Sequence, residues 1–143
     1  MTELHCFVVW HNARGKEKEI EQDIKSKFKI LNAYEVFWEK NAFLKNLQMM
    51  YGKNIIKTWK KERKIGKGSF LLYKVLDENP IHQAEDNKNI NILKAKKLYR
   101  EMTGGGHLIH ASDTEIEARE HLNILLNQEN SSNISKYSFA TQS

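Results

Sequence analysis

The chain alternates between short apolar runs and longer segments in which apolar residues recur every three to four positions. The first pattern is typical of buried strands and the second of helices that pack by one face. Strands are predicted at 6–10, 30–38, 69–76 and 108–109, and helices at 16–28, 41–51, 92–103 and 113–126. With four short strands that alternate with helices, we predict an α+β fold. It would be a ferredoxin-like α/β sandwich, with a four-stranded, mainly antiparallel sheet and helices packed on it.

The length of 143 residues suits one hydrophobic core. We predict one domain over residues 1–127, followed by a flexible C-terminal tail over 128–143 that is rich in Ser and Asn. The segment 53–67 is predicted to be basic and irregular, with some helix. The single cysteine, Cys6, lies in a strand-like run and is expected to be a small buried apolar residue. No apolar run approaches the ~20 residues of a membrane span, so a cytoplasmic protein is expected, with no membrane partner.

The net charge of +5 comes largely from the basic segment 53–67, which also contains Trp59. Three interpretations remain open for this segment. It could be a solvated loop, a nucleic-acid surface, or a basic entrance that attracts the phosphates of a small ligand.

Histidines are the candidate metal ligands, and their spacing argues against a site. His107 and His110 are three residues apart, and on a strand such residues point to opposite faces. No cysteine or acidic cluster accompanies them. We therefore predict no protein-bound metal.

His110 ends a short strand, and Asp113 is expected to begin the final helix. The free amides and the dipole of a helix N-terminus favour an incoming anion. A neutral imidazole there is a competent nucleophile toward a phosphoryl group. The alternative is a histidine whose ring only covers the end of the strand.

The sequence around His110 resembles a known active-site segment, which favours the nucleophile over a purely structural histidine. Residues 107–114, HLIHASDT, resemble the active-site segment NIIHGSDS of the nucleoside diphosphate kinase family, and the order of elements over roughly residues 5–127 is similar. The resemblance implies a ferredoxin-like fold and a catalytic His110, with Ser112 in support. It also implies transfer of the γ-phosphate from a nucleoside triphosphate to a diphosphate by a ping-pong route, with Mg²⁺.

The expected phosphate-binding residues differ from the family pattern. His11 takes the position of a lysine after the first strand, with Asn12 and Arg14 beyond it. His107 takes the position of an asparagine. His121 replaces a glutamate that orients the catalytic ring.

The loop that carries a phosphate-binding arginine in the family is cut here to about residues 102–106, which leaves Arg100 as the nearest basic residue. Arg63 and Lys67 in the basic segment are candidate replacements. Leu47 takes the position of an aromatic residue that stacks on the base.

We therefore expect a phosphotransferase that moves a phosphoryl group through His110 to an acceptor that the sequence does not name. The alternatives are a domain of the same fold that binds a nucleotide or phosphorylated metabolite without turnover, and a basic nucleic-acid-binding module. A homodimer is also expected, because strand 30–38 is apolar on both faces. Such a strand must either lie inside a sheet or be covered by a partner.

Overall fold

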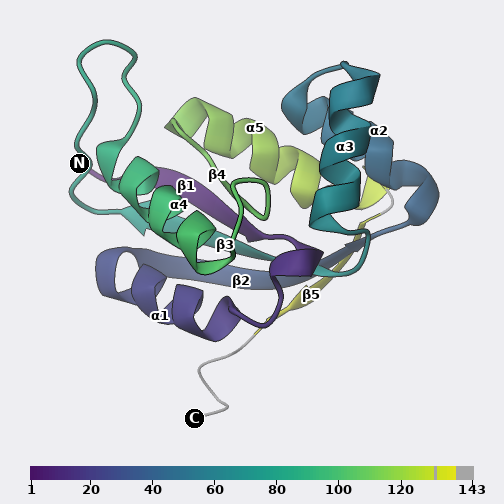
Figure 1. The fold of residues 1–143 in the computed structure, drawn as a ribbon. Helices are drawn as coiled ribbons and strands as arrows, with labels where there is room; N and C mark the ends of the chain where they lie inside the picture. The colour runs from purple at the N-terminus through teal and green to yellow at the C-terminus, as the bar shows by residue number, and fades with distance from the viewer. Residues whose placement is uncertain (131, 138–143) are drawn as a thin grey trace.

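A five-stranded antiparallel sheet forms the centre of the molecule, which is described by a computed structural model over residues 1–130 and 132–137 (Figure 1). The strand order is β4-β1-β3-β2-β5. The strands are β1 (Glu3–Val9), β2 (Lys29–Trp38), β3 (Phe70–Asp77), β4 (Ile109–Ala111) and β5 (Ser132–Lys136). The predicted α+β, ferredoxin-like class is confirmed, with five strands rather than four.

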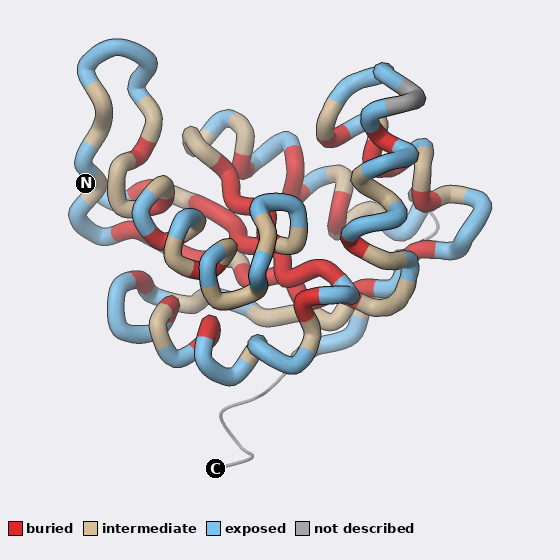
Figure 2. Tube along the Cα trace, viewed as in Figure 1, coloured by how far each residue is buried: buried red, intermediate tan, exposed pale blue. Residues whose placement is uncertain are grey.

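Helices cover both faces of the sheet and enclose two apolar clusters. The α-helices are α1 (Glu17–Lys27), α2 (Lys40–Tyr51), α3 (Ile55–Ile65), α4 (Ile90–Met102) and α5 (Glu115–Leu125), and the 3₁₀ turns are η1 (His11–Ala13) and η2 (Gln128–Asn130). Helices α1 and α4 pack on one face, around Phe7 and Tyr99. Helices α2, α3 and α5 contribute to the cluster on the other face, around Trp10 and Trp38. The central strands β1 and β3 are mostly buried on both sides (Figure 2), which explains their nearly continuous apolar runs.

The basic segment forms a regular helix, α3, where the sequence predicted an irregular segment with some helix. Asn54 caps its N-terminus by accepting a hydrogen bond from the backbone N–H of Lys57 at 3.0 Å. Gly66, at a φ of 80°, ends it. Lys, Arg and Glu are good helix formers. The face of α3 that carries the buried residues Thr58 and Ile65 packs inward.

Part of the segment expected to be a flexible tail is a strand. Residues 132–136 form β5, which pairs with β2. The backbone N–H of Tyr137 extends the pairing by donating to the carbonyl of Ala33 at 2.9 Å. β2 therefore lies inside the sheet, between β3 and β5, so its edge is covered within the chain. Leu31 and Phe37 on its face remain 38% and 39% exposed.

Cys6 is fully buried, as predicted from its position in an apolar strand. Burial raises the pKa of its thiol to about 12. In the described part of the chain, no helix combines the length and the apolar character that a membrane span requires.

Candidate active site

His110 lies at the centre of β4, opposite Val8 of β1. Its side chain is 6% exposed. Directly beyond β4 the chain turns into α5, where Thr114 caps the helix by accepting a hydrogen bond from the backbone N–H of Glu117. The predicted junction of a short strand and a helix is thus present, and it places His110 in a buried position beside α5.

A second histidine contacts His110. The Nε2 atom of His110 lies 2.7 Å from the Nδ1 atom of His121, which is on α5. Tyr51, the last residue of α2, stands perpendicular to the His110 ring, with 5.3 Å between the ring centres and 89° between the planes. The three rings come from β4, α5 and α2, and together they enclose the Nε2 side of His110.

Both imidazoles are held in the neutral form. Burial lowers the pKa of His110 well below its usual 6.5, and the neighbouring His121, Lys96, Lys61 and Arg100 lower it further. Burial also lowers the pKa of His121, although Glu117 and a hydrogen bond to the backbone of Met50 oppose this. At neutral pH the facing nitrogens therefore share one proton in a hydrogen bond between two uncharged rings.

The hydrogen-bond partners assign the tautomers. Since Nδ1 of His121 faces His110, Nε2 is the nitrogen left for the Met50 backbone, whose hydrogen bond favours a proton on the His121 ring. A neutral His121 that donates from Nε2 must accept at Nδ1. His110 therefore donates from Nε2, and its Nδ1 carries the lone pair.

Three cations surround the histidine pair. The Nζ atom of Lys61 lies over the ring of Tyr51, 4.3 Å from its centre, and burial lowers the pKa of this lysine to about 8, with Arg100 contributing. The Nε–H of Arg100 donates to the carbonyl of Ile109 at 3.2 Å, which fixes its position beside β4. Lys96 pairs with Asp113.

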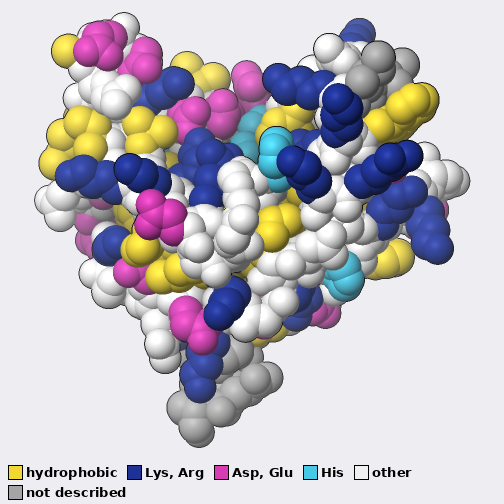
Figure 3. Space-filling model, in the orientation of Figure 1, with side chains coloured by type: hydrophobic (Ala, Val, Ile, Leu, Met, Phe, Trp, Pro, Cys, Tyr) yellow, Lys and Arg dark blue, Asp and Glu magenta, His cyan; other side chains and the backbone are white. Residues whose placement is uncertain are grey.

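An open hollow of about 590 Å³ lies beside Lys96 and Arg100, and His110 is not among its lining residues. Lys96, Arg100, Asp113 and the three glycines of 104–106 contribute to its lining. Lys and Arg side chains also gather over α3 (Figure 3). The site thus combines a neutral imidazole with nearby positive charge, which suits the binding of an anionic phosphate.

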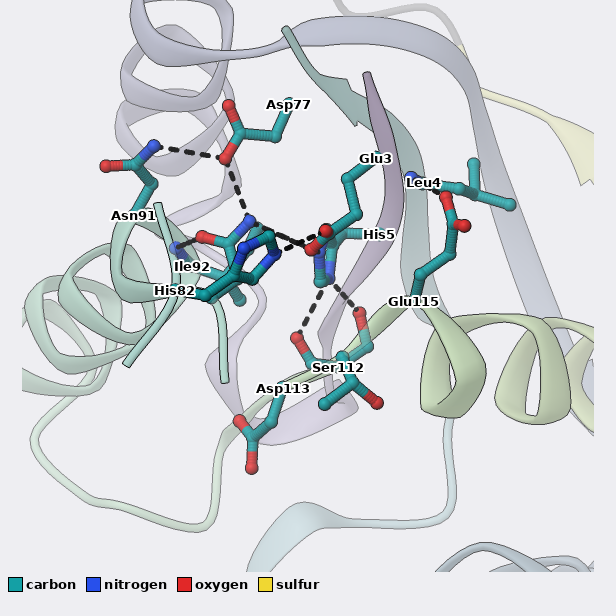
Figure 4. A network of polar contacts seen from close by, with 12 residues as sticks. Glu3, Leu4, His5, Asp77, His82, Asn91, Ile92, Ser112, Asp113 and Glu115 are labelled. Carbon is teal, nitrogen blue, oxygen red and sulfur yellow. Dashed lines mark hydrogen bonds and ion pairs between the residues drawn. The ribbon is translucent and has the colours of Figure 1, made fainter. Parts of the chain in front are cut away.

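Ser112 does not contact the His110 ring. Its Oγ lies 2.9 Å from Nδ1 of His5 and accepts a hydrogen bond from the backbone N–H of Cys6 at 3.1 Å. The Nε2 atom of His5 lies 2.6 Å from the carboxylate of Glu3 (Figure 4). His5 and Ser112 are both fully buried, so this Ser–His–Glu line anchors the β4–α5 junction to β1 and is closed to substrate.

The anchoring network extends to the neighbouring loop. The Nδ2 group of Asn89 donates to Glu3 and to Asp77, and its Oδ1 caps α4 by accepting from the N–H of Ile92. His82 makes a second contact with Glu3 at 2.6 Å. These contacts hold the start of β1, the end of β3 and the start of α4 together, and thereby fix the frame around His110.

The residues after β1 are used in packing. His11 contacts the carbonyl of Ser69, and Asn12 donates to the carbonyl of Lys64. A Cβ atom at Gly68 would lie 2.2 Å from the His11 ring, so a larger residue there would displace the His11 side chain. Arg14 is paired with Glu17 and Glu35. None of the contacts of His11, Asn12 and Arg14 described here reaches His110.

The remaining candidates lie on or near α3. Lys67 pairs with Glu62 at 3.2 Å. Arg63 and His107 are exposed and border one hollow of about 380 Å³. Four lysines, Lys57, Lys60, Lys61 and Lys64, line the same hollow. The structure therefore groups Arg63 with His107, and places Arg100 closest to β4.

Four residues of the site were missed by sequence reasoning: Tyr51, Lys61, Lys96 and Glu117. Glu117 and His121 are four residues apart, which puts them on one face of α5. That spacing was a readable signal. Tyr51, Lys61 and Lys96 carry no local signal that connects them to His110.

The neutral histidines predict an acid-sensitive fold. Between the lowered folded pKa and the unfolded value of about 6.5, the unfolded chain binds more protons than the folded protein. The free energy of unfolding should therefore be fully present above pH 6.5 and fall on acidification below it, by up to ~1.4 kcal/mol per pH unit for each histidine.

Urea denaturation between pH 7.5 and 5.5 measures this slope. His110→Gln should flatten it, whereas His107→Gln, which removes an exposed imidazole, should leave most of it. Equal slopes for the wild type and His110→Gln would contradict a buried neutral His110.

Comparison with known proteins gives the fold. No protein-family model matches the chain. No curated protein matches its sequence. The structure of the Aquifex aeolicus nucleoside diphosphate kinase matches with a TM-score of 0.58 at 16% identity, over 91% of this chain and 99% of that one.

Two further solved structures agree. A nucleoside diphosphate kinase from Borrelia burgdorferi with bound vanadate and ADP matches with a TM-score of 0.53 at 16% identity, over 99% of this chain and 95% of that one. A nucleoside diphosphate kinase family protein from Babesia bovis matches with a TM-score of 0.54 at 15% identity, over 97% and 96%. The protein thus has a nucleoside-diphosphate-kinase-like fold, as the resemblance implied.

Proposed function

We propose that the protein is a phosphotransferase in which Nδ1 of His110 accepts the γ-phosphoryl group of a nucleoside triphosphate and passes it to a second substrate. One observation carries the proposal: the 2.7 Å contact between His110 Nε2 and His121 Nδ1. In this contact His110 donates from Nε2 to His121, which leaves the lone pair of the His110 ring on its Nδ1. The Borrelia burgdorferi structure, with its ADP, supports a nucleotide as the donor.

The step balances without another reactant. The Nδ1 lone pair attacks the γ-phosphorus, the bond from that phosphorus to the bridging oxygen breaks, and the nucleoside diphosphate leaves with the electron pair. The Nε2 proton stays on His110, shared with His121, so the ring gains positive charge. The reverse step, with a new acceptor oxygen, restores the neutral ring.

Charge near the site would stabilise the transferring phosphoryl group. Lys61 and Arg100 are the cations best placed for this, since Lys96 is paired with Asp113. Burial lowers the pKa of Lys61 to about 8, and a bound phosphate would offset this loss of hydration. Arg63, Lys67 and His107, together with His11, Asn12 and Arg14, remain proposed nucleotide contacts further from His110.

Mg²⁺ would enter with the nucleotide. It prefers oxygen ligands and is commonly held by substrate phosphates. Of the carboxylates near His110, Asp113 is paired with Lys96, and Glu117 accepts a hydrogen bond from the N–H of Asp113 at 3.2 Å. Mg²⁺ would therefore be held mainly by the phosphates of the substrate, whose charge it would offset.

The test is incubation of the wild type with γ-labelled ATP or GTP and Mg²⁺. We expect an acid-labile, base-stable label, transferred on to an added acceptor such as a nucleoside diphosphate. Peptide mapping should place it within residues 107–113. Nucleotide binding without label would favour a domain without turnover. Binding of a polyanion alone, falling steeply with salt, would favour a nucleic-acid module based on α3.

His121 is proposed as a positioning residue, and substitutions separate this role from packing. His121→Leu should slow phosphorylation of His110 about tenfold, because losing one hydrogen bond of ~1.5 kcal/mol raises the barrier by that amount. His121→Glu should restore or exceed the wild-type rate, because a carboxylate stabilises the charged ring better.

The pH profile is the discriminating measurement. A carboxylate at position 121 should raise the pKa of His110, so the acid-side loss of rate should move to higher pH in His121→Glu. An unchanged profile would assign His121 a packing role only. Arg119→Gln, on the exposed side of α5, is the matched control and should change neither rate nor profile.

A homodimer remains a proposal. Because β5 covers the edge of β2, a dimer would have to use another surface, such as the exposed side of β5 or the helices. Light scattering should give about twice the chain mass of 16.8 kDa, and a monomer at the same concentration would overturn the proposal.

A further inference from the structure

Three potential metal ligands meet behind the catalytic nitrogen of His110. His110, His121 and Glu117 each offer one ligand atom, and these atoms all lie within 4.8 Å of one another. The facing nitrogens of the two rings are Nε2 of His110 and Nδ1 of His121. Glu117 and His121 project from successive turns of α5, and His110 reaches them from β4. The cluster is formed by the fold, since its members are up to eleven residues apart in sequence.

We propose that this cluster binds a divalent transition metal, of which Zn²⁺ is the test case, and that the bound metal switches off the nucleophile. Two imidazole nitrogens and one carboxylate form a ligand set that suits Zn²⁺ and its neighbours. The proposal concerns the Nε2 side of His110, whereas phosphoryl transfer uses Nδ1, so it goes beyond the proposed function.

The geometry requires only a small adjustment. With metal–nitrogen bonds of about 2.1 Å at a tetrahedral angle, two ligating nitrogens lie about 3.4 Å apart, against 2.7 Å in this structure. The rings would therefore separate slightly.

Two contacts already resemble the outer shell of a metal site. A ligating histidine commonly donates its other N–H to a backbone carbonyl, and His121 has such a contact with the backbone of Met50. The Glu117 carboxylate is held by the N–H of Asp113. Lys61 and Arg100 repel a bound metal cation, so we expect the cluster to bind the metal with micromolar rather than nanomolar affinity.

Metal binding and nucleophilicity then exclude each other through the tautomer. A metal on Nε2 takes the lone pair there, so the neutral ring must carry its proton on Nδ1. The proton leaves Nε2 and an equivalent one is taken up from solvent at Nδ1, with no net release from the ring. In this form Nδ1 has no lone pair for phosphorus.

The first experiment measures binding alone, on the untagged full chain without nucleotide. Calorimetric titration with ZnCl₂ at pH 7.5 should show one site with a Kd of about 1–10 μM. Co²⁺ should give the visible absorption of a tetrahedral site. Glu117→Gln and His121→Gln should each weaken binding at least about 30-fold, and Arg119→Gln, at an exposed position of α5, should not.

The second measurement reads the tautomer. In ¹⁵N spectra of histidine-labelled protein, the proton of His110 should move from Nε2 to Nδ1 when Zn²⁺ is added. Absence of binding by the folded wild type, equal affinity of Glu117→Gln, or an unmoved proton would overturn the proposal. Circular dichroism checks that each variant is folded.

Labelling of His110 with and without Zn²⁺ tests the metal switch and the phosphotransferase proposal separately. With Mg²⁺ and a zinc-selective chelator present, the label on His110 should form, and saturating Zn²⁺ should reduce it at least about tenfold. No label in chelator alone would contradict the phosphotransferase and leave the binding data standing. A label that Zn²⁺ does not reduce would overturn the switch.

Discussion

His110→Gln should abolish the acid-labile phosphate of the protein. Glutamine keeps much of the side-chain volume but has no nucleophilic nitrogen, so at least about a thousandfold loss is expected, as for other enzymes deprived of the nucleophile. The measurement is the label per chain after incubation with γ-labelled nucleoside triphosphate, at equal protein concentration and matched nucleotide saturation.

His107→Gln is the matched control. His107 is exposed in the turn before β4, three residues from His110, and its loss should lower the label without removing it. A label of normal size in His110→Gln would show that the phosphoryl group goes elsewhere and would contradict the assigned nucleophile. Unchanged circular dichroism is required of both variants.

The largest expected effect on stability is at Trp38. Its ring is fully buried and packs against Phe70 and Phe43, with centre distances of 4.9 and 5.1 Å, and against Trp10 at 5.9 Å. Truncation to alanine removes these contacts and leaves a cavity. Trp38→Ala should therefore lower the free energy of unfolding by about 3–5 kcal/mol, a large part of the ~5–15 kcal/mol typical of a domain.

Trp59→Ala is the same chemical change at an exposed site. The Trp59 side chain is 53% exposed on α3, so its loss should change the free energy of unfolding by less than about 0.5 kcal/mol. Urea denaturation followed by circular dichroism compares the two variants without relying on tryptophan emission. Similar losses in both would contradict the packing of the Trp10–Trp38 cluster.

Sequence patterns located best the strands whose apolar residues form a continuous or alternating run. The strand predicted at 30–38 is β2 at Lys29–Trp38, and that at 69–76 is β3 at Phe70–Asp77. Both contain apolar residues wherever a face is covered. α3 was expected to be partly irregular because it is rich in basic, solvated residues. β5 is a polar strand whose partner, β2, lies about a hundred residues away.

By itself the sequence determined the alternation of strands and helices, the burial of Cys6, and the position of His110 just before a helix N-terminus. Each depends on residues that are neighbours in the chain. The protonation of His110, its tautomer and its closeness to Lys61 and Tyr51 arose only on folding. A pKa depends on desolvation and on charges within a few ångströms, and these come from β4, α2, α3 and α5, which no local pattern brings together.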